Sequence, residues 1–516
     1  MYAKKITVLF GATVCLAGGA LAQINDPIPT AVENQGLRVE ITELARFPDT
    51  RGLHPETDPD LVPAYARVNY VRDLPDGRRF ANDIRGLLYE LDEDNQTSVY
   101  LNIADHFPNT YYLGLVSGLI GFEFHPEFAD NGLFYTVHGE WADGNSGVLD
   151  FIPPSYTVEN VTFHNVINEW RAADPGAGAF EGTRRELFRA GHVVDNFYHP
   201  FSFVGFNPTS EPGDPDYGLL YTSGSDLGFS NGGGPNGENA SALGRLDSVV
   251  GALLRIDPRS PSESGGTKGL GDYTIPPINL FASDDDPNTL GEIFAYGFRN
   301  VHRLSWDRSD GTLFGSEIGN SHIEEINIIH EGGNYGWFDR EGFYDNGVDI
   351  PGGSMLVVYP LPLDILDGRT EDGYLYPVAL YDHDEGWAVA PGFVYRGSVP
   401  ALAGKFVFGD IQNGRLFVAD VAELRRGLDA SSIELLDAGV RVVPEFELNR
   451  SFEETQNKSL SVMSVVFQIL QHLWTSYSDE GVRVVVDRQG GRWHYARVLH
   501  AAFPGTILKV QCESPE

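Results

Sequence analysis

Residues 131–135 read Asn131-Gly132-Leu133-Phe134-Tyr135. The phrase joins a turn dipeptide to a short run of aliphatic and aromatic residues, which favour β-strands. Because glycine accepts a positive φ, an Asn-Gly or Asp-Gly pair at this place predicts a tight hairpin turn that leads directly into a strand. Related phrases recur on both sides of it, and their recurrence decides the expected fold.

Four further phrases share a polar turn with glycine and a following strand: Asp76-Gly77-Arg78-Arg79-Phe80, Tyr217-Gly218-Leu219-Leu220-Tyr221, Asp310-Gly311-Thr312-Leu313-Phe314 and Gly404-Lys405-Phe406-Val407-Phe408. Three upstream strand ends match them: Phe124-His125-Pro126, Phe206-Asn207-Pro208 and Trp306-Asp307-Arg308. Such spacing is typical of four-stranded blades repeated around an axis. We predict an all-β chain, a six-bladed β-propeller whose sixth blade forms near a terminus; a large sandwich is the alternative.

The composition agrees with many short strands. The chain has 516 residues, with 59 Gly, 31 Pro and 12% aromatic residues, a profile that suits turns and strands better than a helical bundle. The formal net charge is -37. Such a surface repels phosphate backbones, so we expect no nucleic-acid partner. Solubility in an exported environment is the simpler reading of this charge.

The first 22 residues are predicted to be a signal peptide. Lys4 and Lys5 form a charged start, residues 6–16 are mostly apolar, and Ala20-Leu21-Ala22 provides small residues for cleavage. No later stretch has the length and apolar purity of a membrane span. We therefore expect an exported protein, periplasmic or secreted, without a membrane span.

The pattern of apolar, Pro and Gly residues changes along the chain and divides it into further segments. We expect an irregular N-terminal leader at 23–60, the propeller at 61–450 and an unclear segment at 451–516. Within the last segment, residues 460–474 show helical spacing of apolar residues, and two short strands flank Gln489-Gly490-Gly491. This segment either completes the last blade or is an appendage.

Several motifs between residues 70 and 420 resemble the pyrroloquinoline-quinone-dependent glucose/sorbosone (aldose sugar) dehydrogenase family. They are Gly118 to Phe128, Gly251 to Pro258, Glu292 to Trp306, Glu324-Glu325-Ile326-Asn327 with Gly332 to Trp337, Ala388 to Gly392, and Gly414-Arg415-Leu416. The resemblance implies a six-bladed propeller that holds pyrroloquinoline quinone (PQQ) and Ca²⁺ in its central mouth. It also implies oxidation of the anomeric carbon of a sugar, with electrons passed on to an acceptor.

The resemblance assigns roles to four residues around the quinone. His199 stands at the position of the catalytic base, and histidine suits this role because it titrates near neutral pH. Arg299, Asn300 and Arg396 stand at cofactor-binding positions, where a guanidinium could bind carboxylates or quinone oxygens. Two alternatives remain open: a structural histidine at His199, and at Arg299 an arginine that ties blade loops together.

The resemblance also implies two calcium positions. The carbonyls of Gly319 and Asn320 stand where the cofactor-bridging Ca²⁺ is held, and Glu325 with the Tyr335 carbonyl resembles a second, structural position. Oxygen ligands suit this hard cation. Glu325 could instead be a solvated surface charge. The run Asp382-His383-Asp384-Glu385 could also bind a metal, although a solvated loop is the favoured interpretation of it.

Three departures from the family pattern concern the pocket. Pro200-Phe201-Ser202 replaces small residues after the histidine, Val116 replaces a polar residue, and Gly224-Ser225-Asp226 replaces a Gly-Asp-Gln loop. Phe201 is therefore expected to narrow the space for a flat cofactor. Two functions follow: a quinone-dependent sugar dehydrogenase, or an exported calcium-binding propeller that binds a sugar or a protein partner without redox catalysis.

Overall fold

The computed structural model describes residues 24, 26–29, 32, 34–55, 66–114, 116–154, 156–193, 199–227, 243–284, 286–347, 357–361, 373–411, 415–425, 445–448, 484–486 and 506–511. The predicted signal peptide, the predicted helix at 460–474 and the Gln489-Gly490-Gly491 turn lie outside these residues. In the described part of the chain, no helix has the length and apolar character needed to cross a membrane.

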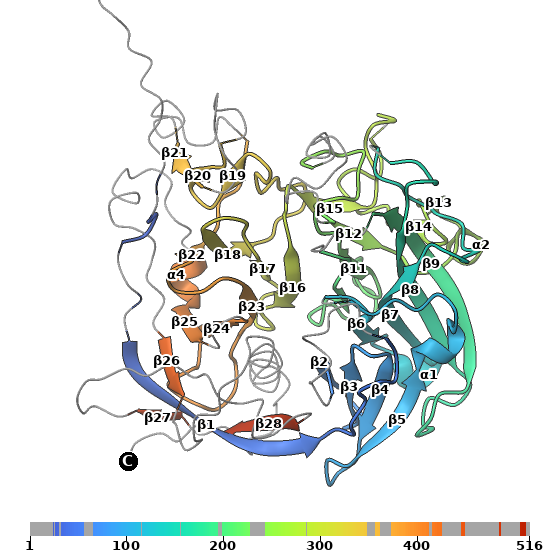
Figure 1. Ribbon diagram of the computed structural model, residues 1–516, viewed down its shortest axis with the longest axis horizontal. Coiled ribbons are helices and arrows are strands. Elements are labelled where there is room, and N and C mark those ends of the chain that lie inside the picture. Colours follow the sequence, from blue (N-terminus) through green and yellow to red (C-terminus); the bar gives the residue numbers. More distant parts are fainter. Residues whose placement is uncertain are drawn as a thin grey trace, which may run out of the picture.

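Five sheets stand around a common centre (Figure 1), which makes the fold an all-β propeller. Blade one contains β2 (Val68–Asp73), β3 (Arg79–Asp83), β4 (Leu87–Leu91) and β5 (Thr97–Asn102). Blade two contains β6 (Leu119–Phe124), β7 (Leu133–Trp141), β8 (Phe163–Ala172) and β9 (Gly182–His192). Blade three contains β10 (Val204–Phe206), β11 (Leu220–Ser223), β12 (Ala252–Ile256) and β15 (Ile293–Tyr296).

The fourth and fifth blades follow in chain order. Blade four contains β16 (Val301–Trp306), β17 (Leu313–Glu317), β18 (Ile323–Ile328) and β22 (Ala379–Asp382). Blade five contains β23 (Val389–Val394), β24 (Lys405–Asp410), β25 (Leu416–Asp420) and β26 (Glu445–Leu448). Neighbouring strands within each blade are antiparallel. The first strands β2, β6, β16 and β23 lie toward the centre of the ring in Figure 1.

The recurring turn-strand phrase marks the second strand of each of these blades. Phe80 lies in β3, Leu133 in β7, Leu313 in β17 and Phe406 in β24, while Leu219 directly precedes β11. The three upstream motifs stand at the ends of the first strands β6, β10 and β16. The hairpin interpretation of the phrase is therefore confirmed, and the sandwich alternative is excluded.

A sixth separate blade is not confirmed in the described residues. The long strand β1 (Asn34–Arg46) pairs parallel with β26 and antiparallel with β27 (Val484–Val486) and β28 (Thr506–Gln511). These strands extend the sheet of blade five across the gap toward blade one (Figure 1). The described parts of the segment 451–516 thus join the sheet around β1. Residues 34–46, expected to be part of an irregular leader, form a strand.

The remaining elements are short and lie in the connections. They are the 3₁₀ turn η1 (Ile103–His106), the helices α1 (Phe128–Asn131), α2 (Pro261–Ser264) and α4 (Val421–Arg425), and the strands β13 (Thr267–Lys268), β14 (Thr274–Ile275), β19 (Arg340–Glu341), β20 (Tyr344–Asp345) and β21 (Tyr359–Pro360). The strands β19 to β21 form a small sheet of their own beside blade four.

The hydrophobic core is divided into clusters that lie between adjacent blades. Phe80 from blade one and Phe124 from blade two contact each other with ring centroids 4.5 Å apart. Phe314 of blade four meets Phe406 of blade five at 4.8 Å. Aromatic residues of the turn-strand phrases thus bury a large apolar area at the joints between blades, where burial stabilises the ring.

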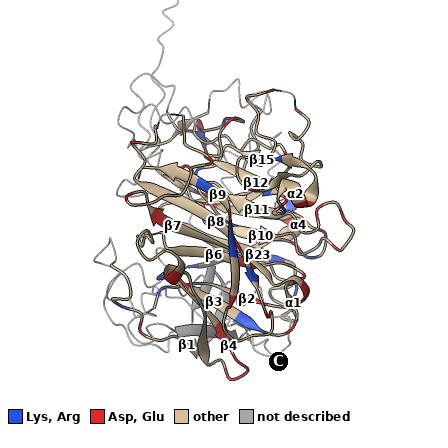
Figure 2. Cartoon of the chain, turned by 90° about the vertical axis from the view of Figure 1, so that its right-hand side faces the viewer, with Lys and Arg blue, Asp and Glu red and all other residues tan. Residues whose placement is uncertain are grey.

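Charged residues are distributed over the blades. On the side drawn in Figure 2, acidic and basic residues alternate along strands and loops without forming one large patch of either sign. On this side, the acid excess of the chain is therefore not gathered in one place.

We expect the glycine of the opening phrase to be irreplaceable. Gly132 has a φ of +68°, and an added Cβ would lie 2.5 Å from the carbonyl oxygen of Ala172. Gly144 has a φ of +70° with nothing within 4 Å, so Gly144→Ala isolates the backbone strain, about 1 kcal/mol. Gly132→Ala should lower the free energy of unfolding by clearly more in urea denaturation. Equal losses in both variants would contradict the close contact.

Candidate functional site

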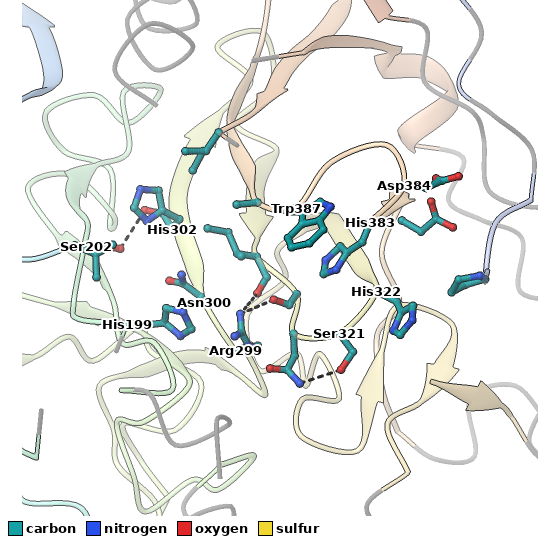
Figure 3. A pocket seen from close by; sticks show the side chains of 18 of the residues that line it. His199, Ser202, Arg299, Asn300, His302, Ser321, His322, His383, Asp384 and Trp387 are labelled. Atoms are coloured by element: carbon teal, nitrogen blue, oxygen red, sulfur yellow. Dashed lines mark hydrogen bonds between the residues drawn. The ribbon is translucent and has the colours of Figure 1, made fainter. Parts of the chain in front are cut away.

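The central mouth of the propeller contains a cavity of about 650 Å³. It is built from connections of blades three, four and five, with contributions from Val116, which precedes blade two, and from Pro27 of the N-terminal segment. Its lining includes His199, Ser202, Arg299, Asn300, Ile318, Gly319, Asn320, Ser321, His322, Asp382, His383, Asp384 and Trp387. Figure 3 shows His199, Asn300 and Arg299 toward one end and His383, Asp384 and Trp387 toward the other. The structure therefore brings together five of the eight predicted site residues.

His199 precedes β10 and is fixed by a carboxylate from the next strand connection. Its Nδ1 lies 2.7 Å from Oδ1 of Asp226, which follows β11. The His199 and Asp226 side chains are 4% and 0% exposed. Burial lowers the pKa of His199; Asp226 partly offsets this effect, and Arg299 adds to the lowering. The imidazole is therefore neutral at pH 7, and Nδ1–H donates to Asp226, which leaves Nε2 as the basic nitrogen.

Arg299 lies in the crossing from blade three to blade four, and both its backbone and its side chain make hydrogen bonds. Its backbone N–H donates to Oε1 of Glu317 at 2.6 Å, and its carbonyl accepts the N–H of Asp226 at 2.7 Å. Nη1 donates to the carbonyls of Ile318 and Gly319. Nε lies 3.9 Å from Oδ2 of Asp226. Arg299 is thus buried beside the His199–Asp226 pair, and it is the one Lys or Arg among the described lining residues.

Asn300 is positioned from the same crossing by blade three. Its Oδ1 accepts the hydroxyl of Ser225 at 2.9 Å, and this hydroxyl also lies 3.2 Å from the Pro200 carbonyl. The substituted loop Gly224-Ser225-Asp226 therefore contributes two functional contacts, one to Asn300 and one to His199.

The expectation that Phe201 narrows the pocket is wrong. Pro200 and Ser202 line the cavity, whereas Phe201 is 1% exposed and packs into a core cluster, with its ring 5.7 Å from that of Phe188. Side chains alternate between opposite faces of an extended chain. Phe201 therefore points away from the cavity, and the small Ser202 points toward it.

The far end of the cavity carries acidic and aromatic groups. Nε2 of His383 lies 3.0 Å from Oε1 of buried Glu324. Burial lowers the pKa of His383, but Glu324 outweighs this effect and the pKa is raised overall. Burial, together with Asp384, raises the pKa of Asp382 to about 8. Asp382 and Glu385 are buried, so the interpretation of this run as a solvated loop is wrong for these two residues.

The first predicted calcium position does not fit the residues present. The Gly319 carbonyl accepts a hydrogen bond from the Arg299 guanidinium, and a divalent cation there would lie beside a fixed positive charge. The N–H of Asn320 donates to Glu341 at 3.0 Å. In the described residues, no group of three or more His, Cys, Asp or Glu side chains could hold a metal ion.

The second predicted calcium position contains buried carboxylates. Glu325 lies opposite Glu317 on the paired strands β17 and β18, and one amide group, that of Asn327, donates to both at 3.1 and 3.2 Å. Among the described residues, Oδ1 of Asn327 is buried and has no hydrogen-bond partner. Burial raises the pKa of Glu325 to about 7. Tyr335 lies in the loop after β18, and its hydroxyl donates to the Ile328 carbonyl at 2.7 Å. Glu325 is buried, so a solvated surface charge is excluded, and calcium binding by Glu325 and the Tyr335 carbonyl stays a prediction.

Arg396 does not join the cavity. Its guanidinium pairs with the fully buried Asp307 at the end of β16, and Arg425 pairs with the same carboxylate. This arginine ties blade five to blade four through a shared acid. The predicted cofactor role has no support from its position.

Two functional residues were missed by sequence reasoning. Asp226 was present in a segment noted only as a departure, although a carboxylate near a histidine is a recognisable pairing. Glu341 comes from a separate small strand, β19, and no local pattern connects it with the loop after β17.

Part of the chain that builds this site matches a known family model. Residues 267–445 match the family model described as Glucose / Sorbosone dehydrogenase. The matched segment covers less than half of the chain. It includes Arg299, Asn300, Gly319 and Glu325, whereas His199 and Asp226 lie before it.

Relatives of known sequence cover part of the chain. The HIPL1 protein of Arabidopsis thaliana is 28% identical over 351 residues, covering 61% of this chain and 45% of that protein. The HIPL2 protein of the same plant is 28% identical over 326 residues, or 58% and 43% of the two chains. The chain thus spans less than half the length of these curated relatives.

Solved structures with a similar arrangement include two aldose sugar dehydrogenases. The soluble enzyme from Escherichia coli, in its apo form, is 18% identical with a TM-score of 0.49, covering 75% of this chain and 86% of that chain. The PQQ-bound form from Streptomyces coelicolor is 17% identical with a TM-score of 0.45, covering 75% and 82%.

Asp226→Asn should lower the pKa of His199 further, because Asp226 is the group that favours the charged imidazole. The shift can be followed by NMR titration of the His199 ring protons. Asp216→Asn is the matched control, since Asp216 pairs with Arg255 on the outer part of blade three. An unchanged His199 pKa in Asp226→Asn would contradict the assigned pair.

Glu325→Gln tests the buried carboxylates of blade four. The raised pKa of Glu325 means that its stabilising contribution is complete below about pH 4.5 and is lost as the pH rises through about 7. In chelator at pH 8 the variant should therefore melt at a higher temperature than the wild type.

If Ca²⁺ binds here, it should raise the wild-type Tm by mass action and the variant Tm less. Glu93→Gln, on the surface, is the control; a lower Tm of Glu325→Gln in chelator would contradict the titration.

Proposed function

We propose that this chain is a quinone-dependent dehydrogenase that oxidises the anomeric carbon of an aldose. The observation that carries the proposal is the buried His199–Asp226 pair at the wall of the cavity, with Arg299 beside it. A neutral imidazole whose Nδ1 is fixed by a carboxylate is suited to take a proton through Nε2. The match of the adjoining segment to the glucose/sorbosone dehydrogenase family supports the reaction class.

The residues of the cavity are compatible with PQQ. The volume of about 650 Å³ is sufficient for a drug-sized ligand, and Phe201 leaves it open. Arg299 lines the cavity and carries the positive charge that suits an acidic or quinone oxygen. Arg299 and Asn300 are the residues that would hold the cofactor.

The roles of the chain's own residues follow from these contacts. His199 accepts the proton of the anomeric hydroxyl at Nε2, and Asp226 stabilises the imidazolium that forms. Arg299, held by the carbonyls of Ile318 and Gly319, keeps Asp226 oriented and presents positive charge to the cavity. When bound, PQQ supplies a two-electron acceptor for the hydride of the anomeric carbon. A separate acceptor would be needed to take up these two electrons.

One observation favours the second candidate, a propeller that binds a sugar or protein partner without redox catalysis. The guanidinium of Arg299 already donates to two carbonyls of its own chain. Less of its hydrogen-bonding capacity is left for a cofactor with several carboxylates. Binding of an uncharged sugar would not need that capacity, so cofactor binding decides between the two functions.

The expected export of the chain and its expected sixth blade belong to the same proposal. Export to the periplasm or the outside would place the protein with sugars and a separate electron acceptor. The strands around β1 would supply the sixth blade of the ring.

His199→Ala should lower turnover of an aldose by about 10²–10⁴-fold, the usual loss for a general base, while PQQ affinity stays nearly unchanged. Arg299→Ala and Arg299→Lys should weaken PQQ binding, because both lose the forked donor. The wild type is mixed with PQQ and assayed by absorbance and by bleaching of an artificial electron acceptor. His54→Ala and the exposed Arg259→Ala are controls.

Two results would contradict the dehydrogenase. Absence of PQQ binding by the wild type leaves the binding propeller as the function. Full activity of His199→Ala would remove the base assignment and leave the fold assignment intact.

A further inference from the structure

One carboxylate organises the loop that lines the cavity between β17 and β18. Oε1 of Glu341 accepts four consecutive backbone N–H groups, from Asn320, Ser321, His322 and Ile323, at 3.0, 2.7, 2.8 and 3.0 Å. Glu341 is 1% exposed. Successive N–H groups that converge in this way form a strong binding position for a negative charge. Here the negative charge belongs to the protein itself.

The other polar side of the same loop faces a cation. The carbonyls of Ile318 and Gly319 accept hydrogen bonds from Nη1 of Arg299. The loop is therefore held between a buried anion, which collects its amides, and a buried cation, which collects its carbonyls. Asn320, Ser321 and His322 line the cavity between these two anchors.

The close approach requires a glycine at the start of the loop. A Cβ on Gly319 would lie 1.6 Å from the Ile323 carbonyl oxygen and 3.0 Å from Oε1 of Glu341. The loop thus closes on itself around the Glu341 carboxylate. A larger residue at Gly319 would push the amides apart.

We propose that Glu341 is a positioning residue that fixes this loop and, through the carbonyls of Ile318 and Gly319, the guanidinium of Arg299. Glu341 and Arg299 together order the loop at Gly319 and Asn320, where the family resemblance implies a cofactor-bridging calcium. A buried carboxylate can do this because hydrogen bonds to a charged acceptor are about twice as strong as those between neutral groups. The order of the loop stands by itself; its effect on cofactor affinity rests on the proposed function.

Hydrogen exchange of the full-length protein, followed by mass spectrometry, tests the loop directly. In Glu341→Gln the amides of residues 320–323 should exchange at least about tenfold faster, since a neutral amide oxygen replaces a charged acceptor. Glu341→Asp keeps the charge on a shorter side chain and should give an intermediate rate. It also serves as the second variant if Glu341→Gln folds poorly.

Asp83→Asn is the matched control. Asp83 is fully buried in blade one and accepts the N–H groups of Arg67 and Arg85. This variant should speed exchange at those two residues and leave residues 320–323 as in the wild type. It shows how much hydrogen exchange changes when a buried carboxylate that accepts backbone N–H groups is lost away from the cavity.

Two further arms separate the loop from calcium and from the chemistry. Wild-type exchange at residues 320–323 should be the same in Ca²⁺ and in chelator. PQQ affinity, measured by quenching of tryptophan fluorescence, should fall at least about tenfold in Glu341→Gln and stay unchanged in Asp83→Asn.

Equal exchange in wild type and Glu341→Gln, or protection that disappears in chelator, would overturn the proposal. If the wild type binds no PQQ, the proposed function fails, whereas the exchange result still decides the role of Glu341. If PQQ binds equally well to wild type and Glu341→Gln, the link from the loop to Arg299 is wrong.

Discussion

The guanidinium of Arg299 is the contact on which the candidate site depends. It lies where the chain crosses from blade three to blade four, and its hydrogen bonds and charge reach both blades at once. On one side is the Asp226 carboxylate that orients His199; on the other are carbonyls of the loop between β17 and β18. A single planar cation can do this because its five donors point in fixed directions. Burial makes each of these contacts stronger than it would be in water.

The rest of the propeller supplies the rigidity that this contact needs. Aromatic residues such as Phe80, Phe314 and Phe406 fill the joints between blades, so the blades meet at fixed positions. Close packing of this kind transmits small displacements instead of absorbing them. Residues from three blades can therefore keep a common geometry at the centre, although they come from distant parts of the chain.

The sequence was most informative where local chemistry determines structure. The turn phrases around Gly132, Gly218 and Gly311 predicted the second strands because a positive φ and a strand former stand side by side. The number of blades was less accessible, since the pairing of β1 with β26, β27 and β28 depends on residues hundreds of positions apart. Phe201 was misjudged for a local reason: its size was considered, but not the alternation that turns it into the core.

The site shows the same division. His199, Arg299 and Asn300 were found through motifs with fixed spacing, and the structure places them in one cavity. Asp226 was visible in the sequence. Its pairing with His199 became evident only in the structure, where the start of β10 lies beside the end of β11. Glu341 could not have been found in the sequence, because its role depends on four backbone amides of residues 320–323, which belong to another loop. The charge partners of Arg396 likewise became known only from the structure.

The pairing of β1 has a consequence for how the protein reaches its native state. This strand precedes β28, one of its partners, by most of the described chain. Contacts that span most of a chain form slowly, since the intervening residues must first be brought together. The ring therefore stays unclosed while most of the polypeptide emerges from the ribosome. Late closure leaves the edges of the sheets exposed to chaperones and to aggregation until the partner strands of β1 have been made.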